Sequence, residues 1–241
     1  MKDDFKPHEA LILAGGLGRR LRAAVSEVPK PMAPVGERPF LEFLLDYWLE
    51  QGITRFVLSV GYLAEHIENH FGSIYKGAAV EYVREKEPLG TGGALAMALR
   101  EINWQGRRIL SLNGDTWLTV SLPLLTAESE KGLPVVLALT EVAVNDRYGR
   151  VTLDQQGRVE SFGGPADGSP ALINAGCYIL DTAALIKITT DYPSRFSLEN
   201  DLLAPLAERG LVGASIQAAD FIDIGVVEDY SRFCRQKSNA D

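Results

Sequence analysis

The feature that most constrains the fold of this chain is the alternation of short apolar runs with amphipathic segments over its first half. The apolar runs are short, as buried parallel strands are. The segments between them carry apolar residues at helical spacing, and the first of these segments stops at Gly52. The expected strands are residues 9–14, 54–60, 79–83 and 108–112, and the expected helices are residues 39–51, 64–71 and 91–101. This order predicts an α/β fold with a doubly wound, mostly parallel sheet and helices on both faces.

The pattern changes after about residue 135. Strand-like runs then follow one another, separated by turn signals such as Gln156-Gly157 and Gly163-Gly164-Pro165. Ser197 is a plausible cap and Gly210 a stop for a late helix. The expected elements are strands 135–140, 149–153, 158–162, 172–180 and 221–223, and helices 197–208 and 226–235. We therefore expect a mixed α+β second half, and, with no linker or internal repeat, a single domain over residues 1–241.

The composition argues against several classes of protein. With 46% hydrophobic and 23% charged residues, the chain is typical of a globular protein. Its net charge of −8 argues against a nucleic-acid partner, and no apolar run approaches the roughly 18 residues that cross a bilayer. Residues 1–8 lack a signal-peptide core, and the only cysteines are Cys177 and Cys234. We expect a cytoplasmic protein that binds neither nucleic acid nor membrane, as a monomer or a homo-oligomer.

A glycine-rich, cationic stretch follows the first expected strand. Its glycines let a backbone approach an anion closely, and its cations supply positive charge. These residues are Gly15, Gly16, Gly18, Arg19, Arg20, Arg22 and Lys30. The stretch does not match the P-loop, and it departs from the dinucleotide fingerprint because Leu21 stands where the third glycine belongs. An ordinary strand–helix turn is the alternative, but the cations favour a small phosphorylated ligand.

Other polar segments follow expected strands in the same way. Residues 85–93 come after the third strand, Asp115 after the fourth, and Asp223 ends a late strand. In open α/β sheets ligands bind beyond the carboxyl ends of the strands, so these segments are expected to meet at one edge. Taken singly, Asp115 also fits a turn after Gly114, and Asp223 also fits a helix cap.

The motifs along the chain resemble those of the sugar-1-phosphate nucleotidyltransferases. LAGGLGRRL and PKPMAPV stand where that family has G-G-x-G-T-R-L and P-K-P. The resemblance continues in the same order through EPLGTGG, NGD, NAG and FIDIG. The chain length, PKPMAPV with PFLEFLL, and FIDIGVVEDY are most similar to the bacterial D-glycero-α-D-manno-heptose 1-phosphate guanylyltransferases. The resemblance implies a Rossmann-like nucleotidyltransferase fold, with a nucleotide-binding half over about residues 1–140 and a sugar-binding half over about residues 141–241.

The resemblance also implies a reaction. A nucleoside monophosphate passes from an NTP, GTP on the narrower match, to a sugar 1-phosphate, and pyrophosphate is released. Arg20 stands at the motif arginine and would stabilise the leaving phosphates, and Lys30 stands at the motif lysine and would hold the reacting phosphates against their mutual repulsion. Asp115 and Asp223 are hard oxygen ligands suited to Mg²⁺, the expected cofactor. The expected partners are therefore small molecules. Taken alone, Arg20 and Lys30 could equally be surface cations, and a turn residue and a helix cap are the stronger interpretations of Asp115 and Asp223.

Further residues are expected around the base, the phosphates and the sugar. A carboxylate accepts hydrogen bonds from guanine N1–H and the N2 amine, so Glu85 or Glu87 could contact the base, although a solvated loop charge is an equal alternative. Residues 89–93 are expected to let the backbone lie close to the base. Asn174 with Gly176 suits sugar hydroxyls, although Asn174 could equally only satisfy the end of a strand. The expected binding residues are Leu13, Ala14, Gly15, Gly16, Gly18, Arg19, Glu85, Glu87, Leu89, Gly90, Thr91, Asn113, Gly114, Asn174 and Gly176, with Glu160 and Glu199 as further sugar contacts.

Two departures from the family pattern raise alternatives. Arg19 stands at the motif threonine, and Gly163-Gly164-Pro165 stands where many relatives carry a Glu-Lys pair. Another cation would then have to meet the sugar phosphate, and the candidates are Arg147, Arg150 and Arg195. The competing functions are a mannose- or glucose-1-phosphate nucleotidyltransferase with another base, and a non-catalytic sugar-nucleotide sensor. A pure sensor would not need both metal carboxylates.

Overall fold

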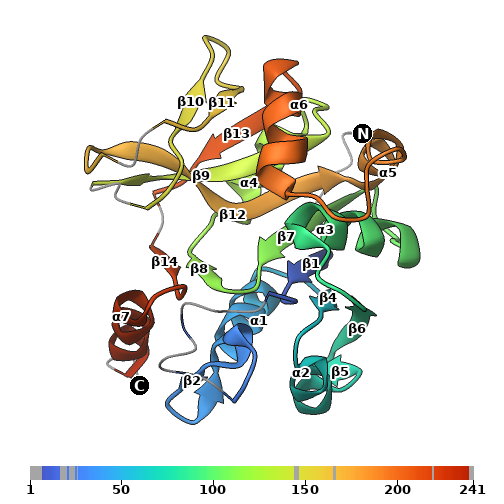
Figure 1. The fold of residues 1–241 in the computed structure, drawn as a ribbon, viewed down its shortest axis with the longest axis vertical. Helices are drawn as coiled ribbons and strands as arrows, with labels where there is room; N and C mark the ends of the chain where they lie inside the picture. The colour runs from blue at the N-terminus through green and yellow to red at the C-terminus, as the bar shows by residue number, and fades with distance from the viewer. Residues whose placement is uncertain are drawn as a thin grey trace.

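The central feature of the computed structural model is an eight-stranded sheet in the order β13-β9-β12-β7-β1-β4-β6-β5 (Figure 1). The structure describes residues 7–16, 21, 25, 27–143, 147–164, 167–218 and 220–238. The sheet strands are β1 (Glu9–Leu13), β4 (Arg55–Val60), β5 (Ile74–Tyr75), β6 (Ala78–Arg84), β7 (Arg108–Asn113), β9 (Val135–Val142), β12 (Ala171–Asp181) and β13 (Val212–Ile216).

Most strands of this sheet point the same way. β1 pairs in parallel with β4 and β7, β4 with β6, and β9 with β13. β12 runs antiparallel to both β7 and β9, and β5 runs antiparallel to β6. The mostly parallel sheet expected from the sequence is therefore confirmed. The strands β9, β12 and β13 of the second half extend the sheet of the first half rather than forming a separate layer.

Helices cover both faces of the sheet. Neighbouring residues of β1 are fully buried in different apolar cores: Ile12 packs in the core that holds Leu44 of α1, and Leu11 in the core that holds Leu95 of α3. Successive side chains of a strand point to opposite faces, so the sheet is doubly wound. The helices are α1 (Phe40–Glu50), α2 (Ala64–Phe71), α3 (Gly90–Glu101), α4 (Leu122–Ser129), α5 (Thr182–Ile188), α6 (Ala204–Glu208) and α7 (Val227–Ser238), with a 3₁₀ turn at Lys30–Met32.

A third apolar core lies beside the sheet, under the C-terminal helix. Phe233 of α7 packs against Phe40 and Trp117, with ring centroids 4.8 and 5.5 Å away. The short strand pairs are β2 (Pro34–Val35) with β3 (Arg38–Pro39), β8 (Thr116–Leu118) with β14 (Phe221–Asp223), and β10 (Val151–Leu153) with β11 (Val159–Phe162). Figure 1 shows α7 and β14 side by side at the edge of the molecule. The packing of Phe233 thus fastens α7 to the start of α1 and to β8.

Some elements differ from the sequence-based expectation. The helix expected at residues 197–208 begins as a π-helical segment, Leu198–Leu203, before α6 continues it. Ser197 caps it as expected, because its hydroxyl accepts the Asn200 N–H at 3.2 Å. The elements α4, α5 and β13 were not expected. In α4 the apolar residues do not form one stripe, since Leu122 and Leu125 are buried while Leu124 is exposed.

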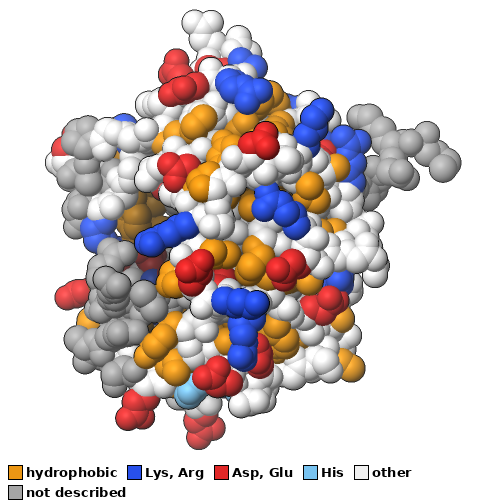
Figure 2. Space-filling model, turned by 45° about the vertical axis from the view of Figure 1, so that its right-hand side comes forward, with side chains coloured by type: hydrophobic (Ala, Val, Ile, Leu, Met, Phe, Trp, Pro, Cys, Tyr) orange, Lys and Arg blue, Asp and Glu red, His pale blue; other side chains and the backbone are white. Residues whose placement is uncertain are grey.

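The surface carries charges of both signs. On the face shown in Figure 2, Lys and Arg side chains alternate with Asp and Glu side chains over the described part of the molecule. Within the described ranges, no helix combines the length and the apolar character that a membrane crossing requires.

Candidate active site

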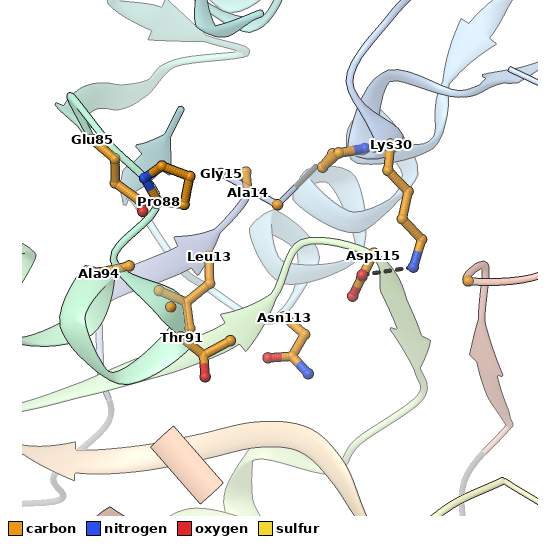
Figure 3. A pocket seen from close by; sticks show the side chains of 14 residues that line it. Leu13, Ala14, Gly15, Lys30, Glu85, Pro88, Thr91, Ala94, Asn113 and Asp115 are labelled. Carbon is orange, nitrogen blue, oxygen red and sulfur yellow. Dashed lines mark hydrogen bonds and ion pairs between the residues drawn. The ribbon is translucent and has the colours of Figure 1, made fainter. Parts of the chain in front are cut away.

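Three strand ends and the start of α3 enclose a cavity of about 420 Å³, the first cavity. Because β1, β6 and β7 are parallel, their carboxyl ends meet at one edge of the sheet. Figure 3 shows Glu85 on one side of the cavity and Lys30 with Asp115 on the other, with the end of β1 between them. The lining residues are Leu13, Ala14, Gly15, Gly16, Lys30, Pro31, Glu85, Pro88, Gly90, Thr91, Ala94, Asn113, Asp115 and Gly225.

A second cavity of about 240 Å³ adjoins the first. The two share Lys30, Thr91, Asn113 and Asp115. The other residues of the second cavity are Thr116, Tyr148, Gly149, Asn174, Ala175, Gly176, Tyr178, Leu198, Glu199, Phe221 and Asp223. Two ligands bound in these cavities would therefore meet at the side chains of Lys30 and Asp115.

Lys30 lies at this junction between two carboxylates. Its Nζ donates to Asp115 Oδ2 at 2.7 Å and to Asp223 Oδ1 at 3.2 Å. The lysine side chain is 10% exposed, whereas those of Asp115 and Asp223 are 38% and 21% exposed. The antiparallel pairing of β8 with β14 sets Asp223 opposite Thr116 and so brings the two aspartates together. Asp223 does not cap α7, because its Oδ1 accepts the Gly225 N–H at 2.8 Å in a turn before that helix.

Glu85 closes the far end of the first cavity. Its Oε2 accepts the Leu89 N–H at 3.0 Å, and its Oε1 lies 3.5 Å from the Ser59 hydroxyl. Burial raises the pKa of Glu85, while these two hydrogen bonds act in the opposite direction. A Cβ on Gly15 would stand 2.2 Å from Glu85 Oε1. Glycine at this position therefore leaves the room that the carboxylate occupies.

The glycines at the start of α3 divide between the first cavity and helix packing. Of the three glycines Gly90, Gly92 and Gly93, only Gly90 lines the first cavity, and its φ of +73° suits glycine. A Cβ on Gly92 would meet the Phe196 ring at 2.3 Å, and a Cβ on Gly93 would meet the Ser194 carbonyl at 2.2 Å. These two glycines let α3 pack against the segment before α6, and neither lines the first cavity.

The polar wall of the second cavity is held by a short hydrogen-bond chain. Asn174 Oδ1 accepts the Gly176 N–H at 3.0 Å, and its Nδ2 donates to the Tyr178 hydroxyl at 2.9 Å. Burial raises the pKa of Glu199, and a hydrogen bond with Asn174 lowers it in part. Gly176 has a φ of +70°, and a Cβ there would stand 2.4 Å from Asn113 Nδ2. The expected sugar contacts Asn174, Gly176 and Glu199 thus lie together.

Other expected residues lie outside both cavities. Glu87 is exposed on its loop, the Leu89 N–H is bound to Glu85, and Gly114 packs against the Leu13 carbonyl. Glu160 is exposed on β11. The residues Gly18, Arg19, Arg20 and Arg22 lie outside the described part of the chain. Of the motif cations, Lys30 is therefore the one that the structure places.

The three arginines proposed to replace the missing lysine take different positions. Arg150 donates to Ser169 Oγ at 2.6 Å, and Arg195 is exposed before Phe196. Arg147 donates to the Tyr148 hydroxyl at 2.5 Å and pairs with Asp229. Among the residues that the structure describes, Lys30 is the only Lys or Arg that lines either cavity.

Sequence reasoning missed several residues of the second cavity, chiefly Tyr148, Tyr178 and Phe221. Tyr178 follows Asn174 by four residues on β12, where the register with β9 shifts between the two. A regular strand would place both side chains on the same face, which the sequence could have indicated. Tyr148 and Phe221 lie far apart in the chain and meet edge to face at 5.2 Å, a contact without a local signal.

Comparison with known proteins points to one class of enzyme. The family model described as "Nucleotidyl transferase" matches residues 9–239. A D-glycero-alpha-D-manno-heptose 1-phosphate guanylyltransferase of Campylobacter jejuni is 39% identical over 227 residues, which cover 93% of this chain and 98% of that protein. A protein of the same name from Aneurinibacillus thermoaerophilus is 39% identical over 225 residues, 93% of this chain and 96% of that protein.

A solved structure is also similar. HddC from Yersinia pseudotuberculosis, complexed with GMP-PN, superposes with a TM-score of 0.82 at 34% sequence identity. The superposition covers 95% of this chain and 99% of that chain. The similarity therefore extends over both cavities and not over the first half of the chain alone.

Proposed function

Because this chain belongs to the nucleotidyl transferase family, we propose that it transfers the nucleoside monophosphate of an NTP to a sugar 1-phosphate and releases pyrophosphate. The observation that carries the proposal is the pair of adjoining cavities that share Lys30 and Asp115. The first cavity has the size and the apolar walls of a nucleotide site, and the second has the polar groups that sugar hydroxyls need. The phosphates of two such ligands would meet at Lys30.

The chemistry asks for charge neutralisation and alignment. An oxygen of the sugar phosphate, already ionised, attacks the α-phosphorus and forms the new P–O bond. The bond from the α-phosphorus to the bridging oxygen breaks, and its electron pair leaves on pyrophosphate. No proton has to be removed from the nucleophile, so positioning and electrostatics dominate. The ammonium of Lys30 offsets the repulsion between the two anionic reactants, and a side chain at Gly16 would project into open space, so phosphates can approach the backbone there.

Asp115 and Asp223 would hold Mg²⁺. Both carboxylates reach the same ammonium from different elements and remain partly exposed, so two hard oxygen donors face one cationic position. Within the described residues, no group of three His, Cys, Asp or Glu forms a self-contained metal site. Mg²⁺ takes one or two carboxylates and completes its shell with phosphate oxygens and water. The ion would act as a Lewis acid on the phosphate oxygens.

We further propose GTP as the nucleotide and D-glycero-α-D-manno-heptose 1-phosphate as the acceptor. Glu85 supports the choice of base, because a carboxylate accepts hydrogen bonds from both N1–H and the N2 amine of guanine. The names of the two relatives support both substrates. The complex of the structural neighbour with GMP-PN supports a guanine nucleotide in the first cavity.

The test is a pyrophosphate-release assay with four NTPs and a panel of sugar 1-phosphates. We expect GTP with the heptose 1-phosphate to be preferred, and omission of Mg²⁺ to abolish release. A preference for UTP or dTTP would contradict the guanylyl assignment, and a preference for mannose 1-phosphate would contradict the heptose assignment. Binding of a sugar nucleotide without release from any pair would support a sensor instead of an enzyme.

A further inference from the structure

The C-terminal helix α7 lines neither cavity, yet it contacts several segments that do. The Tyr230 hydroxyl donates to the carbonyl of Pro34, four residues after Lys30. Arg232 Nη2 donates to the Phe221 carbonyl at 3.0 Å, two residues before Asp223. Phe233 packs the helix against the third apolar core. The segments that carry Lys30 and Asp223 are therefore both tied to α7.

Asp229 is the charged centre of this arrangement. Its Oδ1 pairs with Arg232 at 3.2 Å on the same helix, and its Oδ2 pairs with Arg147 from the loop after β9. The Asp229 side chain is 15% exposed. One partly buried carboxylate thus joins the Phe221 segment to the Arg147 loop.

Arg147 in turn holds Tyr148. It donates to the Tyr148 hydroxyl at 2.5 Å, and its guanidinium carbon lies 5.0 Å from the centre of that ring. The Tyr148 ring meets Phe221 edge to face at 5.2 Å. Both aromatic residues line the second cavity beside Asp223. The Tyr148 side chain is thus held by a hydrogen bond from Arg147 and by a ring contact with Phe221, and two such contacts fix a side chain better than either alone.

From these contacts we propose that Asp229 is a positioning residue for the acceptor: it fixes Arg147 and Arg232, and through them it sets the Tyr148–Phe221 wall of the second cavity. The inference rests on the proposed function, because it assigns the acceptor sugar phosphate to that cavity. Removal of the charge would leave Arg147 and Arg232 without the carboxylate that they share and would weaken the hold of Arg147 on Tyr148. Asp229, Arg147 and Arg232 do not line the first cavity, so nucleotide binding should change less than acceptor binding.

The experiment compares Asp229→Asn, Asp229→Glu and Arg147→Met with a control, Glu228→Gln, on the same turn of α7. Glu228 is exposed, and removal of its charge leaves the network intact. For Asp229→Asn we expect the KM for the sugar 1-phosphate to rise by roughly ten- to a hundredfold, the usual cost of a misplaced binding group. The KM for the NTP and the melting temperature should change little, and Asp229→Glu should restore most of the loss.

For the double variant Asp229→Asn/Arg147→Met, the KM for the sugar 1-phosphate should rise no further than in the more impaired of the two single variants, because both substitutions break the same connection. Additive losses would overturn the inference, as would equal rises in both KM values together with a fall in melting temperature. The wild type is measured first. A wild type without turnover on any substrate pair overturns the proposed function and the inference with it, whereas an active wild type with an unchanged Asp229→Asn variant overturns the inference alone.

Discussion

The two cavities meet at Lys30 but are lined by different kinds of residue. The wall of the first consists largely of glycine, alanine, proline and backbone, and Glu85 is its main polar group at the end away from Lys30 (Figure 3). The second is smaller, about 240 Å³ against 420 Å³, and its wall carries Asp223, Glu199 and two tyrosines. The first cavity therefore depends on space left free by small residues. The second depends on charged and polar side chains that other residues must hold in place.

This difference predicts how each cavity fails. In the first, an added side chain displaces a neighbour, as a Cβ on Gly15 would displace Glu85. In the second, the loss of a charge would release a side chain, as we propose for Asp229 and the two arginines that pair with it, Arg147 and Arg232. Lys30 belongs to both cavities, so its loss should not distinguish them.

The largest effect is expected for Lys30→Met. We expect kcat/KM to fall by about 10²- to 10³-fold, the cost of removing one group that stabilises charge in the transition state. Both substrates should be affected, because the ammonium lies at the junction of the cavities. Steady-state kinetics with each substrate varied in turn provides the measurement.

The matched control for Lys30→Met is Lys86→Met. Lys86 is exposed next to Glu85 and lines neither cavity, so its variant should retain normal rates. Thermal unfolding should accompany the kinetics, because Asp115 and Asp223 lose their shared partner in Lys30→Met. A loss confined to the KM of one substrate would show that Lys30 serves only one of the two cavities.

A smaller effect, confined to the first cavity, is expected for Glu85→Gln. The amide offers one acceptor where guanine presents two donors, so discrimination in favour of GTP should fall by about 1–3 kcal/mol, the value of a bidentate base contact. That is a loss of roughly 5- to 150-fold in kcat/KM with GTP. The KM for the sugar phosphate should not change.

Glu87→Gln separates the two candidate base contacts. Glu87 is exposed and outside the cavity, so its variant should keep the preference for GTP. If Glu87→Gln loses that preference and Glu85→Gln keeps it, the base lies on the other side of the loop from the one the cavity indicates.

The sheet could be predicted well because its signals are local. Apolar runs mark β1, β4, β6 and β7, and α2 begins and ends where the pattern indicates. The glycines of α3 show the limit of such reasoning. Gly92 and Gly93 contact Phe196 and Ser194, about one hundred residues away in the chain, and nothing local distinguishes a glycine that packs a helix from one that admits a ligand.

The candidate site likewise combines residues that sequence motifs indicate with contacts that only the fold creates. Lys30, Asp115 and Asp223 were expected from motifs, and the structure brings the three together. Their meeting depends on the pairing of β8 with β14, two strands of three residues that lie about a hundred positions apart. Strands this short carry too few residues for a periodic pattern. The Tyr148–Phe221 wall could not be predicted for a related reason, since Arg147 and Asp229 are far apart in the chain and only the fold brings them together.

The smallest expected effect concerns the free energy of unfolding, which the charge of Glu199 in the second cavity lowers. Burial raises the pKa of Glu199 above its ordinary value of 4.5, so the folded chain binds this proton more tightly than the unfolded chain. As the pH rises from the ordinary value through the raised one, the folded state loses stability relative to the unfolded state. Glu199→Gln should remove this loss, so its melting temperature should exceed that of the wild type at neutral pH and approach it in acid.

Thermal unfolding between about pH 4 and pH 8 measures this difference, with Glu208→Gln as the control. Glu208 is exposed at the end of α6, and its variant should follow the wild type at every pH. Glu199→Gln should also weaken sugar-phosphate binding, because Glu199 lines the second cavity. A gain in stability together with a loss of acceptor binding would identify Glu199 as a charge kept for the ligand at the expense of the fold. A melting difference independent of pH would contradict this, since packing rather than ionisation would then account for it.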